Sequence, residues 1–404
     1  MTRISGPALV RIPDFRRLGV SVLFNSVGMM GETVVLGWLT LELTDSPLLV
    51  GVAMSMRMLP LFFVGVPAGA LADRVPRQRL LMFTGAGQAL TASILGALAS
   101  LGYVTLAHVL LLTLAAGTLR GVEHAARQGY THDVVGADAL LPGLAVLGVA
   151  MRAGWLVGSL GVGAIIARFG SGAAYFAVAA GFLAGAAALV AASIPPSAMP
   201  SQRESLWQTV VGFVTAMRTQ RSLLVLMVLT AGAEILGFSH QALLPSLARD
   251  VLRAGPEGLG VLAAARSVGG IVGLAAATLR RSTAGGATFV GVLFSFGASL
   301  VGLALAPQLV DFAGVVGVLV VVNAFGALAD LLAQSLLQLG APAHLRGRAG
   351  GAWVVAIGLA PLGQLQIGAL ASLFGVSIAF GASGLALVGL VAVTALLFPA
   401  VRRL

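Results

Sequence analysis

We single out five of the charged residues that fall within long apolar stretches of the sequence, where an unpaired charge is costly if the stretch crosses a membrane. They are Glu32, Arg57, Arg152, Glu234 and Arg266. Ionisable groups at such depth usually face the interior of a helix bundle or a wet cavity, and they often carry function. We therefore take these five residues as candidates for a transport cavity and for proton coupling.

Glu32 and Arg57 come from adjacent apolar stretches that run in opposite directions. At a rise of about 1.5 Å per residue, the depths of the two side chains agree to within about one helical turn. A buried ion pair between them is therefore geometrically possible. Such a pair either lines a cavity and takes part in proton coupling, or is purely structural.

Glu234 lies near the middle of the apolar stretch 222–247, and Arg266 lies in the next stretch. A carboxylate removed from water can take up a proton, which proton-driven transport requires. The alternative is a carboxylate that Arg266 neutralises. Arg152 lies at the centre of its own stretch, where it either pairs with a carboxylate or attracts an anionic substrate.

Other polar residues are expected to have passive roles. We place Glu123 and Asp330 near the inner ends of helices, where solvent would surround them. His240 can titrate near neutral pH, but at an outer helix end we expect it to make a passive polar contact.

The composition indicates elements that lie in a membrane. The chain is 58% hydrophobic and 9% charged, with a mean hydropathy of +1.00, whereas soluble domains are about 25% charged. We predict an all-α integral membrane protein with twelve transmembrane helices of about 20 residues each. The predicted spans are 17–41, 47–71, 79–101, 105–128, 139–167, 172–193, 222–247, 256–280, 285–306, 310–333, 350–373 and 376–399.

The basic residues predict the topology. All 24 are Arg, and most fall at the N-terminus, in the even-to-odd turns, in the middle connection and at the C-terminus. The opposite turns hold only Arg168, Arg249 and Arg253. The positive-inside rule therefore places both termini in the cytoplasm. The net charge of +10 fits this topology better than it fits a nucleic-acid surface.

We expect two six-helix bundles, at 1–193 and 222–404, joined by a cytoplasmic linker at 194–221. The linker begins with a Pro-rich segment and continues with apolar residues at helical spacing, which predicts an amphipathic helix on the membrane surface. The two halves also share a pattern at equal spacing, in which Pro47, Gly51, Val52 and Arg57 recur as Pro256, Gly260, Val261 and Arg266. Parallel repeats of this kind suggest a transporter with its site between the bundles.

A charged turn between the second and third spans resembles the cytoplasmic motif of the major facilitator superfamily. Its residues here are Gly69, Asp73, Arg74, Arg77 and Arg79. The resemblance implies that Asp73 faces the start of the eleventh helix, whose free N–H groups attract an anion. Contacts of this kind would form a cytoplasmic gate. The alternative is a turn that only anchors the topology.

Further motifs are similar to the bacterial enterobactin-exporter and macrolide-efflux group, among them Phe15-Arg16-Arg17-Leu18 and Leu345-Arg346-Gly347-Arg348. A superfamily pattern in the fourth span expects an Arg, which Arg120 supplies, and we group it with the gate. The fifth span carries a glycine-rich face that permits close helix approach. Its residues are Gly154, Gly158, Ser159, Gly161 and Gly163.

These features predict a secondary active transporter, a proton-coupled exporter of a small organic molecule such as a drug, a siderophore or a secondary metabolite. We expect it to be a monomer in the bacterial cytoplasmic membrane, with protons as coupling ion, without a cofactor, metal or nucleic-acid partner. An uptake carrier, a lipid flippase and a non-transporting receptor or scaffold remain alternatives. An enzyme is disfavoured, because the sequence contains neither His-Glu-x-x-His nor Gly-x-Ser-x-Gly, nor a P-loop.

Overall fold

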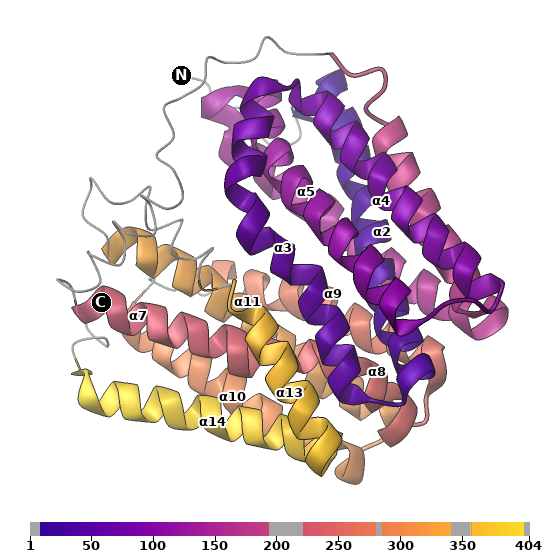
Figure 1. Ribbon diagram of the computed structural model, residues 1–404. Coiled ribbons are helices and arrows are strands. Elements are labelled where there is room, and N and C mark those ends of the chain that lie inside the picture. The colour runs from indigo at the N-terminus through magenta and orange to yellow at the C-terminus, as the bar shows by residue number, and fades with distance from the viewer. Residues whose placement is uncertain (1–8, 194–220, 280–284, 341–355, 357, 400–404) are drawn as a thin grey trace. The chain divides into compact units, whose positions relative to one another are not determined.

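The computed structural model describes residues 9–193, 221–279, 285–340, 356 and 358–399, which are almost entirely helical (Figure 1). Nine helices in this part of the chain are long and apolar enough to cross a membrane. The prediction of an all-helical membrane protein is thus confirmed. The predicted linker helix and the start of the span predicted at 350–373 lie outside the described residues.

The first half of the chain contains α2 (Pro13–Thr44), α3 (Pro47–Arg74), α4 (Arg77–Ser100) and α5 (Leu106–Ala187). Helix α5 has 82 residues and breaks at Gly136 and Gly170, which have φ of 72° and 80°. Glycine adopts such positive φ angles without steric cost. We therefore divide α5 into a first segment (106–136), a second segment (137–170) and a third segment (171–187). The first segment extends beyond the span predicted at 105–128.

The second half contains α7 (Arg221–Gly232), α9 (Gly255–Leu279), α10 (Gly286–Leu309), α11 (Phe312–Gly340), α13 (Ala360–Phe374) and α14 (Val376–Leu397). Within the second half, α10 packs along α11 and α14, and within the first half α4 packs along α5 (Figure 1).

The chain leaves regular α-helix after α7. A π turn η1 (Ala233–Gly237) leads into a 3-10 helix η2 (Phe238–Leu243), one α turn α8 (Leu244–Ser246) and a second π turn η3 (Leu247–Val251). Pro245 contributes to this break, because its ring clashes with the carbonyl group four residues earlier and it has no N–H to donate. The span predicted at 222–247 is present as Leu223–Val251, but its second half is not regular α-helix. Such irregular turns are frequent at functional sites.

Contacts divide the chain into two compact units. The first unit comprises Met1–Leu43, Met56–Arg203 and Pro256–Gly260, and the second comprises Thr44–Ser55, Glu204–Gly255 and Val261–Leu404. The first turns of α3 and α9, which the sequence repeat relates, therefore each belong to the unit that does not hold the rest of their helix.

Glycine makes these two helix starts possible. A Cβ atom on Gly51 would collide with the carbonyl oxygen of Gln364 in the second unit. In the first unit, a Cβ on Gly260 would lie 2.7 Å from the carbonyl oxygen of Ser159 and 3.2 Å from Cα of Gly163. Small residues let helix backbones touch in this way. The glycines of the predicted repeat are therefore helix contact points.

The second segment of α5 packs closely on α2. A Cβ on Gly154 would meet the carbonyl oxygen of Leu23, and one on Gly158 would meet that of Val27. The predicted glycine face therefore does allow close helix approach, and it fixes α2, which carries Glu32.

Candidate functional site

Glu32 of α2 is the centre of a buried ion cluster in the first unit. Arg57 Nε on α3 lies 3.6 Å from Glu32 Oε2, and Arg120 Nη2 on the first segment of α5 donates to the same oxygen. The three side chains are between 7% and 12% exposed. The expected pair of Glu32 and Arg57 is thus present. Arg120, which the superfamily pattern groups with the gate, belongs to this cluster through its contact with Glu32.

Backbone contacts hold the cluster in place. Arg57 Nη2 donates to the carbonyl oxygen of Met29, at 3.0 Å. Gly117, one turn before Arg120, lies so close to α3 that a Cβ would come within 2.6 Å of the Arg57 carbonyl oxygen. Because any larger side chain would push the helices apart, glycine at this position lets Arg120 reach Glu32. Three helices thus meet at one carboxylate.

A second buried ion pair lies further along the first segment of α5. Glu123 is 3% exposed, and its Oε1 lies 3.2 Å from Arg127 Nη1. The prediction of a solvated Glu123 is wrong, because the helix does not end near Glu123 but continues to Gly136, and the side chain lies beside Ser21 and Asn25 of α2. A cavity of about 10 Å³, which has room for about one water molecule, adjoins the pair and is also lined by Ser21 and Asn25.

Arg77 of the predicted gate motif binds within the first unit. Its Nη1 donates to both carboxylate oxygens of Asp133, at 2.7 and 2.8 Å. The neighbouring Gln78 donates to the carbonyl oxygens of Leu189 and Ala192, at 2.5 and 3.0 Å. The start of α4 is therefore tied both to the first segment of α5 and to the end of the sixth predicted span.

The rest of the motif is less defined. Arg74 and Arg79 are exposed. Gly69 and Asp73 belong to α3, but the structure does not describe the environment of these two residues. The start of the span that Asp73 was expected to face also lies outside the described residues. A gating contact of Asp73 stays a prediction.

Glu234 lies in η1, where the chain leaves regular α-helix, and is 9% exposed. The carboxylate of Asp330 on α11 and the guanidinium group of Arg266 on α9 are near enough to act on it electrostatically. Two carboxylates and a guanidinium group of the second unit are therefore electrostatically coupled. Asp330, which we expected to be solvated, is only half-buried within α11.

The true counterpart of Glu32 in the second unit is Gln241. Arg266 Nη1 donates to Gln241 Oε1 at 2.7 Å, and the two residues are 25 positions apart, as are Glu32 and Arg57. Glu234 is therefore not the partner that the repeat assigns to Arg266. The repeat places an amide where the first half has an acid.

Two further residues complete the inventory. Arg152 is half-buried in the second segment of α5. His240 is 1% exposed, its Nδ1 donates to the carbonyl oxygen of Gly237 at 2.7 Å, and its ring stands edge-on to Phe296. The contact with Gly237 fits the passive polar role expected for His240, although the side chain is more deeply buried than a helix end suggests.

Comparison with known proteins places this arrangement in a family. Residues 4–403 match the family described as transmembrane secretion effector, which is part of the major facilitator superfamily. The chain belongs to this family. No curated protein sequence matches this secretion-effector chain significantly.

Solved structures share the fold of this secretion-effector chain. The crystal structure of the peptide transporter POT in complex with sulfate has a TM-score of 0.79 at 15% identity, with 99% of each chain covered. That of the nucleoside transporter NupG has a TM-score of 0.74 at 14% identity, with 96% of this chain and 98% of that chain covered. A POT family transporter in complex with 5-aminolevulinic acid has a TM-score of 0.73 at 10% identity, with 96% of each chain covered.

The family identifies the chain as a multi-pass membrane transporter, a class of protein that is generally not enzymatic, and the solved structures share its fold. Sequence reasoning missed several partners in this transporter, notably Asp133 for Arg77, Arg120 for Glu32 and Gln241 for Arg266. Of these partners, only Gln241 could have been found from the sequence, because its separation from Arg266 equals the separation of Glu32 from Arg57.

Proposed function

We propose that the chain is a proton-coupled exporter of a small organic molecule that works by alternating access. The observation that carries the proposal is Glu234, a buried carboxylate on an irregular turn beside Asp330 and Arg266. A proton on one of the two carboxylates balances the cluster against the single guanidinium group of Arg266. This cluster is the coupling site, and the family's description as a secretion effector favours outward transport.

The charges of the first unit suit a different task. The single carboxylate of Glu32 forms ion pairs with the two guanidinium groups of Arg57 and Arg120. We assign this cluster, together with Arg152, to the transport cavity. Drugs, siderophores and secondary metabolites are the cargo classes that we consider, and the enterobactin-exporter and macrolide-efflux group is the subgroup that the sequence motifs favour.

The membrane arrangement that we propose has twelve spans. Nine spans are the helices identified by length and composition. One of these is a 50-residue stretch that the break at Gly170 divides into two spans, which gives ten. Helices α3 and α13 supply the remaining two. Six spans form each bundle, at 1–193 and 222–404, and both termini lie on the Arg-rich cytoplasmic side. We place this monomer in a bacterial cytoplasmic membrane.

Alternating access is supported by the starts of α3 and α9. Each first turn packs with the unit that does not contain the rest of its helix, and each makes its contact through a repeat glycine, Gly51 or Gly260. Inverted-repeat and parallel-repeat transporters rock one bundle against the other around a fixed site.

Transport into inverted membrane vesicles tests the proposal. We expect at least one compound from a panel of cationic drugs, macrolides and siderophores to accumulate when the vesicle interior is acidified, and a protonophore to abolish the accumulation. Vesicles without the protein are the control. If no compound moves with the gradient, the exporter proposal fails. Gradient-driven loss of a compound from the vesicles would favour the uptake carrier instead.

A further inference from the structure

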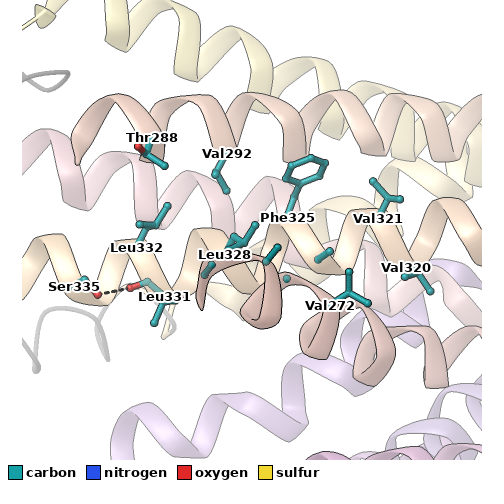
Figure 2. Close-up of a pocket in the computed structure, with 14 residues that line it drawn as sticks. Val272, Thr288, Val292, Val320, Val321, Phe325, Leu328, Leu331, Leu332 and Ser335 are labelled. Carbon is teal, nitrogen blue, oxygen red and sulfur yellow. Dashed lines mark hydrogen bonds between the residues drawn. The ribbon is translucent and has the colours of Figure 1, made fainter. Parts of the chain in front are cut away.

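A cavity of about 560 Å³ lies among α9, α10 and α11 of the second unit. Its volume is in the range of small-molecule pockets, about 300–1,000 Å³. Figure 2 shows the lining running along one side of α11, from Val320 at one end to Ser335 at the other. All residues of the lining are apolar except Thr288 and Ser335.

Small residues create the cavity. A Cβ on Gly273 would lie 3.1 Å from Cα of Ala324, so α9 and α11 touch there through their backbones. One turn further along α9, Ala276 and Ala277 extend too little to fill the space toward α10. A space without partner atoms forfeits dispersion energy along its whole lining. An apolar occupant of matching shape is therefore favoured.

The cavity is open on one side. Val272, Val321 and Leu331 line it and are 49%, 46% and 40% exposed. All three belong to helices that are long and apolar enough to cross a membrane. In the proposed membrane topology the opening lies at the depth of the hydrocarbon core, where acyl chains are the apolar molecules present at the highest concentration.

The two hydroxyl groups mark one end of the cavity. Thr288 is in the first turn of α10 and Ser335 near the end of α11, and Figure 2 shows them at the same end. Ser335 Oγ donates to the carbonyl oxygen of Leu331 at 2.9 Å, so its oxygen can still accept. The turn before α10 carries Arg280 and Arg281 in the sequence, which the positive-inside rule places at the cytoplasmic surface.

We propose that this cavity binds one acyl chain of a phospholipid from the cytoplasmic leaflet. The ester region of the lipid lies at the end marked by Thr288 and Ser335, where the hydroxyl group of Thr288 can donate to an ester carbonyl oxygen. The chain runs along Leu328 and Phe325 toward the bilayer centre. The inference rests on the membrane topology proposed above, but on neither the direction of transport nor the coupling ion.

Photo-crosslinking tests the lipid site. The full chain is reconstituted in vesicles of phosphatidylethanolamine and phosphatidylglycerol that contain a trace of phospholipid with a diazirine in one acyl chain. After irradiation, peptide mass spectrometry locates the adducts. We expect them to concentrate on the lining of α9, α10 and α11. A diazirine near the ester should label the Thr288 end, and one near the chain terminus should label the Val320 end.

Variants that fill the cavity sharpen the test. Ala276→Phe displaces several methylene groups, and at about fourfold in affinity per methylene we expect labelling of the lining to fall about tenfold or more. Ala277→Leu is the milder version if the larger residue impairs folding. Leu385→Phe on α14, at a position that is 63% exposed and outside the lining, is the matched control and should leave labelling unchanged.

Adducts spread evenly over all exposed apolar helices, or unchanged by Ala276→Phe and Ala277→Leu, would overturn the proposal. Displacement of the lipid label by a transported compound would also overturn it, because the cavity would then belong to the cargo. The labelling pattern and the effect of the variants are measured without cargo and without a pH gradient, and a transported compound is added only in the displacement arm. Failure of the lipid proposal is therefore distinguishable from failure of the exporter proposal.

Discussion

At the scale of single residues, Glu32 holds two buried guanidinium groups with one carboxylate. Taking an ion out of water costs several kcal/mol, and the cost is offset only while each charge keeps its partner. Replacing Glu32 and replacing one of the two arginines should therefore lower the stability of the protein by different amounts. Loss of the Glu32 carboxylate leaves the like charges of Arg57 and Arg120 without this counter-ion, whereas loss of one guanidinium group leaves one carboxylate paired with one guanidinium group.

Glu32→Gln should lower the free energy of unfolding by about 3–5 kcal/mol, the cost of breaking a buried pair from one side. Arg120→Gln should cost clearly less, because Glu32 keeps Arg57. Thermal unfolding of the purified variants in detergent checks the order. Glu257→Gln, at an exposed position at the start of α9, is the control for the loss of an acid. Equal losses for both cluster variants would contradict the shared-carboxylate arrangement.

Arg77 and Asp133 should behave as one unit. Arg77→Gln and Asp133→Asn each break the bidentate contact, so the double variant should be only slightly worse than either single one. We expect a coupling energy of about 0.5–3 kcal/mol in the double-mutant cycle. Thermal unfolding supplies the four values. Arg79→Gln, at an exposed position of the same turn, should have little effect, and additive losses for Arg77 and Asp133 would refute the coupling.

At the scale of helices, the sequence predicted most spans because apolar runs of about 20 residues between Arg-containing turns leave few alternatives. It did not predict the irregular stretch from Ala233 to Val251, because a hydropathy pattern does not distinguish α-helical from π or 3-10 hydrogen bonding. Gly237 in this stretch makes a close tertiary contact, because a Cβ there would collide with the ring of Phe296 on α10. That contact joins residues far apart in sequence.

The candidate site was predictable only in part, for the same reason. Glu32 and Arg57 could be paired because they lie on neighbouring antiparallel helices at equal depth. Arg120 comes from a helix whose position next to α2 depends on packing at Gly117. Its role therefore could not be inferred from spacing along the chain.

The helix contacts at the repeat glycines give a prediction for these elements. Gly260→Leu should force the first turn of α9 away from the second segment of α5, because even a Cβ would lie 2.7 Å from the Ser159 carbonyl oxygen. We expect a lower melting temperature and reduced transport. Gly291→Leu on α10 is the matched control, since a Cβ there has no heavy atom within 4 Å. If the two variants unfold alike, the backbone contact is not important.

At the scale of the whole molecule, the topology rests on where the Arg residues lie. The chain contains no Cys, so single cysteines report on sidedness without background. Tyr103→Cys and Asp311→Cys should react with a membrane-impermeant maleimide from the outside of intact cells. Ser282→Cys should react only in inverted vesicles. Outside labelling of Ser282→Cys would contradict the proposed twelve-span arrangement.

Coupling between proton movement and cargo movement involves one charged cluster in each unit. The cluster of Glu32, Arg57 and Arg120 has more guanidinium groups than carboxylates, whereas Glu234, Asp330 and Arg266 have the reverse. We assign cargo recognition to the first cluster and proton binding to the second. A variant that disables only the proton site should separate these tasks.

Glu234→Gln in inverted vesicles is the most direct test of this central claim. The variant should still exchange labelled cargo for unlabelled cargo across the membrane, because this exchange needs no net proton movement, and it should lose accumulation driven by an acid interior. Glu257→Gln should retain both activities. Accumulation by Glu234→Gln equal to that of the unmodified protein, over the same pH gradient, would contradict the account.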